Sequence, residues 1–160
     1  IRDRIEASGL KFDMIFGPAY KGIFLGSILA TKMSKEMNMP VCFNRKEVKD
    51  HGEGGSLIGA KPKGKVLVVD DVISSGLAIR ESLSFLKPFD IELVGALVTL
   101  DRQEIGQNSD LSASAELQKD GLNVFSVISL DDLLDANELI DSSSIETIRD
   151  YRNTYQGKNV

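Results

Sequence analysis

The feature that most constrains the fold is an apolar run that ends at two carboxylates. Residues 66–69 read Val-Leu-Val-Val without polar alternation, which is typical of a strand covered on both faces in a parallel sheet. Asp70 and Asp71 follow directly. A turn with two hydroxyls and a glycine (74–76) then leads into a segment with helical apolar spacing (78–86). The order predicts a strand, an acidic pair, a small-residue turn and a helix.

This order suggests the kind of ligand that the turn could bind. A small-residue turn at a helix start directs free backbone N–H groups at one point, where the helix dipole also favours an anion such as phosphate. Asp70 and Asp71 would repel that anion. One ligand satisfies both features if it carries a phosphate at one end and hydroxyls or magnesium at the other, as a phosphorylated ribose does. Alternatively, the two acids only end a strand and cap the turn.

The fourteen residues 65–78 resemble the ribose-phosphate signature of the type I phosphoribosyltransferases. That signature is a hydrophobic strand, two acids, two apolar residues and a short turn bearing hydroxyls and glycine. No Gly-Lys-Ser/Thr follows, so the stretch is not a P-loop, and no Gly-x-Gly-x-x-Gly dinucleotide fingerprint occurs.

Composition favours one globular domain over residues 1–160. The chain is 42% hydrophobic and 27% charged, as expected for a domain with a single core. Its net charge of −5 argues against nucleic-acid or anionic-membrane partners. One cysteine, Cys42, fits a small core residue in a reducing cytoplasm. No apolar stretch approaches the roughly 20 residues of a membrane helix.

Strand-like and helix-like segments alternate along the chain. The expected strands are 12–16, 41–43, 66–69, 93–100 and 124–130. Alternation predicts an α/β fold, a central mostly parallel sheet flanked by helices, with ligands at the carboxyl ends of the strands. Residues 44–59 are polar, charged and glycine-rich, and we expect them to be too irregular for a helix.

The expected helices also have predictable buried faces and ends. A helix after residue 22 should bury Phe24, Ile28, Met33 and Met37. Shorter helices are expected near 1–7, at 112–119 and from 131. The terminal helix should begin at a capping box formed by Ser143 and Glu146 and should line one face with Ile145, Ile148, Tyr151 and Tyr155.

Two loops carry glycines beside cations. Residues 17–22, Gly-Pro-Ala-Tyr-Lys-Gly, allow an abrupt turn whose backbone can approach a ligand, with Lys21 nearby. Residues 43–55 gather most of the local cations before several glycines, as in a mobile flap that closes on a polyanion. Taken alone, the first is more often a plain strand-to-helix turn and the second a solvated hairpin.

Taken together, these motifs sharpen the resemblance. Residues 17–22, 43–47, 49–54, 70–78 and 101–104 occur in the order found in the bacterial-type orotate phosphoribosyltransferases. The resemblance implies the type I phosphoribosyltransferase fold with a flexible flap loop. It also implies magnesium-dependent formation of orotidine monophosphate and pyrophosphate from orotate and phosphoribosyl pyrophosphate, in pyrimidine synthesis. The family works as a cytoplasmic homodimer whose flap reaches into the partner subunit's site.

The resemblance also implies roles for individual residues. The residues that match the family's pyrophosphate loop and flap are Tyr20, Lys21, Arg45, Lys46, Lys49 and His51. Asp70 and Asp71 match the pair on the ribose hydroxyls, with magnesium held mainly by substrate. The loop on the ribose phosphate corresponds to Val72, Ile73, Ser74, Ser75, Gly76, Leu77 and Ala78. Ser74 and Arg102 match the orotate contacts, and an arginine fork can grip a carboxylate twice.

Two departures and three alternatives accompany this interpretation. Leu77 stands where the family usually has threonine or serine, so we expect weaker phosphate binding. The chain begins at Ile1, within a helical pattern, and we expect it to lack the family's N-terminal segment. The alternatives are a transferase for another base, a non-catalytic sensor of the donor and a phosphoacceptor receiver domain. A receiver needs a lysine after a late strand, where this chain has Asp131.

Overall fold

The computed structural model describes residues 2–33, 38–46 and 56–159. Within them, a six-stranded sheet has the order β3-β2-β1-β4-β5-β6. Its strands are β1 (Met14–Phe16), β2 (Val41–Asn44), β3 (Leu57–Gly59), β4 (Gly64–Ile73), β5 (Ile91–Asp101) and β6 (Val124–Ser129). Neighbouring strands pair in parallel, except that β3 runs antiparallel to β2. The predicted mostly parallel sheet is confirmed.

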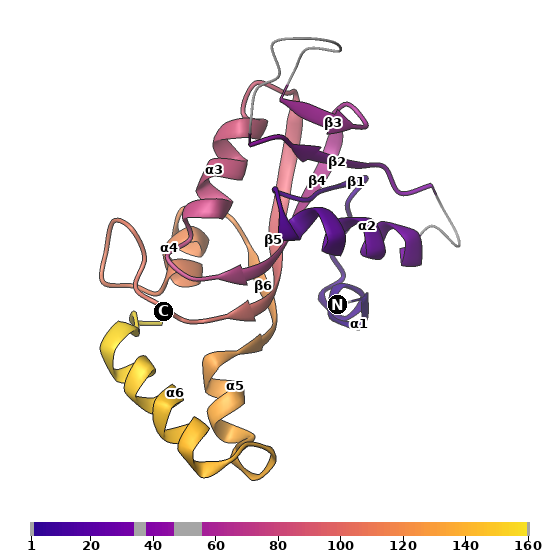
Figure 1. The fold of residues 1–160 in the computed structure, drawn as a ribbon. Helices are drawn as coiled ribbons and strands as arrows, with labels where there is room; N and C mark the ends of the chain where they lie inside the picture. Colours follow the sequence, from indigo (N-terminus) through magenta and orange to yellow (C-terminus); the bar gives the residue numbers. More distant parts are fainter. Residues whose placement is uncertain (1, 34–37, 47–55, 160) are drawn as a thin grey trace.

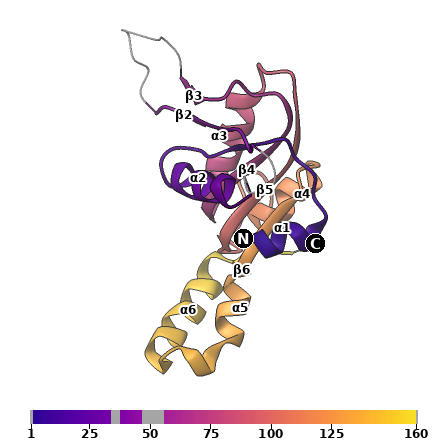
Figure 2. The same ribbon diagram turned by 90° about the vertical axis from the view of Figure 1, so that its right-hand side faces the viewer.

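Helices cover both faces of this sheet (Figure 1). They are α1 (Arg2–Ser8), α2 (Lys21–Met33), α3 (Leu77–Leu86), α4 (Ala113–Lys119), α5 (Leu130–Asp135) and α6 (Ser142–Tyr155), with a short 3-10 turn at Asn137–Leu139. Helices α1 and α2 lie on one side, and α3 and α4 on the other. Helices α5 and α6 lie side by side and project away from the sheet (Figure 2).

The alternation of β4 side chains explains this two-sided arrangement. Val66 and Val68 belong to the apolar cluster that includes α3 and α4 residues, whereas Leu67 and Val69 belong to the cluster with α1 and α2 residues. All four side chains are fully buried. Because successive side chains of a strand point to opposite faces, an unbroken apolar run is required where both faces are covered.

Strand β4 extends further than the sequence predicted. It continues through the acidic pair to Ile73, which pairs with Asp101 of β5. Asp70 and Asp71 therefore lie within the strand and not after it, and pleating directs them to opposite faces. Asp70 shares the face of Val68, on the α3 side, and Asp71 shares the face of Val69, on the α2 side. Backbone hydrogen bonds to β5, which continues to Asp101, favour this extension.

The buried face of α2 differs from the prediction. Phe24 and Ile28 are 70% and 60% exposed. Met33 does pack against the core, and Met37 lies outside the described residues. The helix instead buries Gly22, Gly26, Leu29 and Ala30. Small residues face the sheet because the helix backbone lies close to it: a Cβ on Gly26 would be 3.1 Å from the Ile15 side chain.

Residues 57–59, in the segment predicted not to be helical, form β3, which the sequence did not predict and which pairs with β2. The predicted start of the terminal helix was wrong. The helix begins at Ser142, and its cap is Asp141, two residues before the predicted cap Ser143. The Asp141 carboxylate accepts a hydrogen bond of 3.0 Å from the Ser144 N–H. Aspartate and serine are comparable cap residues, so the sequence pattern alone did not distinguish them.

Candidate active site

The acidic pair lies beside a lysine at the carboxyl ends of the parallel strands. Lys21, the first residue of α2, donates a hydrogen bond of 2.7 Å from Nζ to Oδ2 of Asp71. The Asp71 backbone N–H donates to Oδ1 of Asp70 at 2.9 Å. Lys21 and Asp71 thus pair across two elements, and the Asp70 carboxylate contacts the backbone of the same aspartate.

Burial changes the acidity of one of these carboxyl groups. Asp70 is 7% exposed, and burial raises its pKa to about 6, with the Asp71 charge adding to the rise. The N–H of Asp71 and the charge of Lys21 act in the opposite direction. The carboxylate of Asp71 raises the pKa of Lys21, chiefly through their hydrogen bond. A buried carboxylate with an elevated pKa at a strand end is a feature of functional sites.

The loop at 17–20 is held by close backbone contacts. A Cβ on Gly17 would lie 2.3 Å from the carbonyl oxygen of Gly22, and one on Gly22 would lie 2.7 Å from that of Val69. The Ala19–Tyr20 peptide bond is cis. The N–H of Ala19 donates to the side-chain oxygen of Asn44 at 2.8 Å. Glycines are required here because the loop lies directly against β4 and α2.

The turn from β4 to α3 forms a cavity of about 260 Å³. It is lined by Val72, Ile73, Ser74, Ser75, Gly76, Leu77, Ala78, Ile79 and Glu81. Gly76 has a φ of 79°, a left-handed conformation that favours glycine, and among the described residues no side chain caps α3. Its first N–H groups and the helix dipole therefore favour an anion at this cavity.

Arg102 follows β5 and adjoins the same loop. Its backbone N–H donates to the carbonyl of Ile73 at 3.0 Å. Its guanidinium bonds the hydroxyl of Tyr151, lies 2.5 Å from Oε1 of Glu104, and stacks 5.0 Å from the Tyr151 ring centre. The side chain remains 38% exposed.

The other predicted residues divide into two groups. Lys46 lies over the Tyr20 ring, 5.2 Å from its centre, and the N–H of Arg45 donates to Ser56. Both cations directly follow β2, beside the loop at 17–20. Lys49 and His51, predicted to be catalytic, lie outside the described residues, as does most of the predicted flap.

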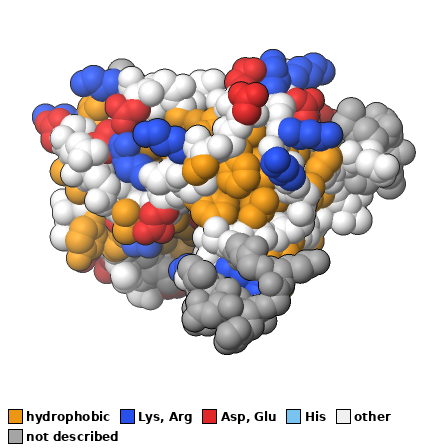
Figure 3. Space-filling view, turned by 90° about the horizontal axis from the view of Figure 1, so that it is seen from above, with side chains coloured by type: hydrophobic (Ala, Val, Ile, Leu, Met, Phe, Trp, Pro, Cys, Tyr) orange, Lys and Arg blue, Asp and Glu red, His pale blue; other side chains and the backbone are white. Residues whose placement is uncertain are grey.

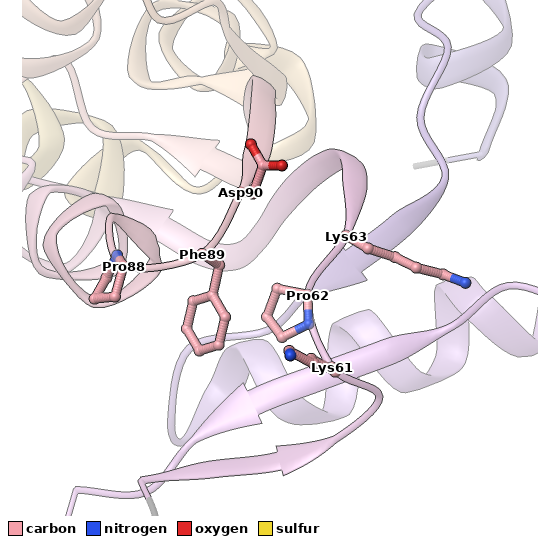
Figure 4. Close-up of a pocket in the computed structure, with 6 residues that line it drawn as sticks. All are labelled: Lys61, Pro62, Lys63, Pro88, Phe89 and Asp90. Atoms are coloured by element: carbon pink, nitrogen blue, oxygen red, sulfur yellow. The ribbon is translucent and has the colours of Figure 1, made fainter.

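A larger cavity lies at the opposite end of the sheet. Figure 3 looks onto that end and shows a central group of hydrophobic side chains bordered by charged ones. The cavity measures about 410 Å³ and lies at the amino ends of β4 and β5, where Pro62 and Phe89 face each other while Lys63 points away from them (Figure 4). Ligands of parallel α/β sheets bind at the carboxyl ends, so we place the active site beside Asp70.

Comparisons with known proteins match this geometry. Residues 1–127 match the family model described as phosphoribosyl transferase domain. The orotate phosphoribosyltransferase of Actinobacillus pleuropneumoniae serotype 5b is 47% identical over 156 residues, which cover 94% of this chain and 73% of the relative. The chain belongs to the orotate phosphoribosyltransferase family. The orotate phosphoribosyltransferase of Laribacter hongkongensis is 52% identical over 132 residues, 81% of this chain and 62% of the relative.

A solved orotate phosphoribosyltransferase has the same fold. The crystal structure from Francisella tularensis superposes with a TM-score of 0.76 at 33% identity, covering 96% of this chain and 75% of that one. Helices α5 and α6 begin after residue 127, where the match to the general phosphoribosyl transferase domain ends. The similarity to orotate phosphoribosyltransferases continues beyond that point.

Sequence reasoning missed a buried carboxylate of α4 that pairs with α3, the helix that follows the candidate phosphate loop. Buried Glu116 accepts hydrogen bonds from the N–H groups of Gln107 and Asn108 and from the guanidinium of Arg80. Burial alone would raise its pKa, but these bonds and that of Ser109 lower it to about 2. The only available signal was a glutamate among apolar residues of a short helix, which does not identify its partners.

Proposed function

We propose that this chain catalyses the magnesium-dependent transfer of phosphoribose from phosphoribosyl pyrophosphate to orotate, giving orotidine 5'-monophosphate and pyrophosphate in UMP biosynthesis. Relatives named orotate phosphoribosyltransferase share about half of its residues. The observation that carries the proposal is the adjacency of the Asp70–Asp71 pair, its Lys21 partner and the uncapped start of α3. This arrangement suits a sugar that bears a phosphate at one end and a pyrophosphate at the other.

Each part of the donor has a matching group. The cavity at 72–78 suits the 5'-phosphate, because backbone N–H groups and the α3 dipole favour an anion. Asp70 and Asp71 can accept hydrogen bonds from the ribose hydroxyls. Lys21 and the two cations after β2, Arg45 and Lys46, would bind the pyrophosphate with Tyr20. Equivalent roles for Lys49 and His51 rest on the sequence alone.

The reaction separates charge, and the site is charged accordingly. Displacement of pyrophosphate from the anomeric carbon develops positive charge on the sugar, through an oxocarbenium-like state, and negative charge on the leaving group. Asp70 and Asp71 favour the positive charge on the sugar, and the lysine and arginine side chains favour the negative charge on the leaving pyrophosphate. The ring nitrogen of orotate is acidic, so we assign no residue as a dedicated base.

The donor set fits magnesium. Among the described residues, no group of three or more His, Cys, Asp or Glu side chains is arranged to hold a metal ion. Carboxylates near the carboxyl end of β4 match the oxygen ligands of magnesium, which keeps several waters and is bound through one or two carboxylates and substrate phosphates. When bound, the ion would neutralise charge on the leaving pyrophosphate. Asp70 and Asp71 would then orient the ion relative to the donor.

We also propose that the chain forms a single phosphoribosyltransferase domain and acts as a cytoplasmic homodimer without nucleic-acid partners. Tyr20, just before α2, and Phe24 and Ile28 within it recur every four residues, and each is at least 60% exposed. An apolar stripe of this kind marks an interaction surface, and a second copy of the chain is the occupant we expect. None of the described helices is long and apolar enough to cross a membrane.

The decisive experiment follows orotate absorbance. The complete gene product should consume orotate only with phosphoribosyl pyrophosphate and magnesium, and uracil, hypoxanthine and adenine should be poor acceptors. Arg102→Ala should raise the KM for orotate at least tenfold, because the carboxylate loses a charged partner. Donor binding without turnover would favour the sensor alternative, and an unchanged orotate KM would remove the assignment of Arg102.

A further inference from the structure

The C-terminal helix α6 contacts the arginine assigned to orotate. Tyr151, in the third turn of α6, bonds the Arg102 guanidinium through its hydroxyl and stacks beneath it at 5.0 Å. The same hydroxyl donates to Oε1 of Glu104, which is also 2.5 Å from the guanidinium. Arg102, Glu104 and Tyr151 thus form a closed group of three side chains.

The backbone around Arg102 is fixed to the same helices. Buried Gln103 has a φ of 54°, and its side-chain amide exchanges two hydrogen bonds with Asp131 of α5, at 2.9 and 3.0 Å. Asp131 in turn pairs with Arg152 of α6 at 2.6 Å. The N–H of Gly157, just after α6, donates to the carbonyl of Gln103 at 2.9 Å. The residues after β5 are therefore held by α5, α6 and the turn that follows α6.

Arg102 consequently has two kinds of neighbour. Its backbone adjoins the loop at 72–78, which lies in the part of the chain matched by the general phosphoribosyl transferase domain. Its side chain is held by α6, which lies beyond that match. The phosphate loop binds the phosphoribosyl donor, which all phosphoribosyltransferases use. An arginine that binds a carboxylate is needed only when the acceptor base carries one.

We propose that Tyr151 is a positioning residue for acceptor recognition: α6 orients Arg102 toward the carboxylate of the acceptor base through the Tyr151 hydroxyl. The arginine side chain has several rotamers. Holding it in one rotamer before the substrate binds reduces the side-chain entropy that is lost on binding. Glu104 holds the same guanidinium nitrogen that Tyr151 bonds, so another edge of the guanidinium remains for the acceptor. This inference rests on the proposed function of Arg102.

Tyr151→Phe tests the proposal, because it removes the hydroxyl and keeps the ring. We expect the KM for orotate to rise about tenfold, the lower end of the effect of a hydrogen bond to a charged group. The KM for phosphoribosyl pyrophosphate and kcat should change less than about twofold, because a positioning role affects one substrate. Tyr155→Phe is the matched control: its ring packs on Tyr151 one turn later, and it is half exposed.

A double-mutant cycle separates positioning from general stability. If the hydroxyl acts through Arg102, Tyr151→Phe should have no further effect on the orotate KM in the Arg102→Ala background. Additive effects, a parallel rise in the donor KM or loss of folding would each overturn the proposal. If Arg102→Ala itself leaves the orotate KM unchanged, the assignment of Arg102 fails. If only Tyr151→Phe is without effect, the inference about α6 fails and the proposed function stands.

Discussion

The ammonium of Lys21 lies 2.7 Å from Oδ2 of Asp71, so the first residue of α2 is paired with the end of β4. Neither charge is buried: the two side chains are 76% and 26% exposed. An exposed pair of this kind contributes little to folding, and its position beside Asp70 gives it a functional consequence.

Lys21→Ala should shift the pH dependence of the reaction. The charge of Lys21 lowers the pKa of Asp70, so its removal should move the acidic limb of the kcat/KM profile for phosphoribosyl pyrophosphate to higher pH. The KM for this donor should also rise, since one cation for pyrophosphate is lost. Lys65→Ala is the control, because Lys65 pairs with Glu92 at the amino ends of β4 and β5. Identical profiles for both variants would contradict the prediction.

Asp70→Asn should stabilise the folded chain at neutral pH while abolishing activity. The pKa of Asp70 is raised from 3.8 to about 6, so the folded state binds a proton more tightly than the unfolded state. The free energy of unfolding therefore falls as the pH rises from about 4 to about 6. The ionised Asp70 carboxylate lowers the free energy of unfolding at pH 7.5 by at most about 3 kcal/mol, and by about 1–2 kcal/mol after solvent screening.

Urea denaturation at pH 4 and pH 7.5 measures this effect. The Asn variant should match the wild type at pH 4 and exceed it at pH 7.5, with Asp90→Asn, an exposed acid before β5, as the control. A variant less stable than the wild type at both values would show that the carboxylate has a structural role.

Leu77→Thr should tighten donor binding. Leu77 is 52% exposed and lines the cavity at the start of α3. A hydroxyl there adds a donor for a phosphate, and one such bond contributes about 0.5–1.5 kcal/mol, or roughly a 2- to 10-fold lower KM for phosphoribosyl pyrophosphate. Leu139→Thr, at an 87% exposed leucine after α5, should leave this KM unchanged. Weaker donor binding in Leu77→Thr would indicate that the leucine itself contacts the substrate.

Gly22→Ala should destabilise the chain, whereas Gly26→Ala should not. A Cβ on Gly22 would be 2.7 Å from the Val69 carbonyl oxygen, whereas one on Gly26 meets a methyl group at 3.1 Å. Both substitutions favour a helix by up to about 1 kcal/mol, but only the first forces backbone apart, which costs about 1–3 kcal/mol. Thermal unfolding compares the two, and equal midpoints would show that the loop yields without strain.

Local patterns accounted for much of the site. The run 66–69 and Gly76 each have a physical reason that acts over a few residues: two covered faces for the run and a left-handed turn for the glycine. The same reasoning failed for α2. Phe24 and Ile28 are as apolar as core residues, but α2 lies so close to the sheet that its small residues face the sheet and these two side chains are exposed. Shape, and not hydrophobicity, selected Gly22 and Gly26 for the buried face.

The sequence by itself determined that a parallel sheet would present two acids and an anion-binding turn at one edge, because strand and turn preferences are local. Only the tertiary structure decided which groups meet there. Lys21 and Asp71 are 50 residues apart, and Arg102 and Tyr151 are 49 apart. Contacts at such separations depend on strand order and helix placement, which no short-range pattern encodes.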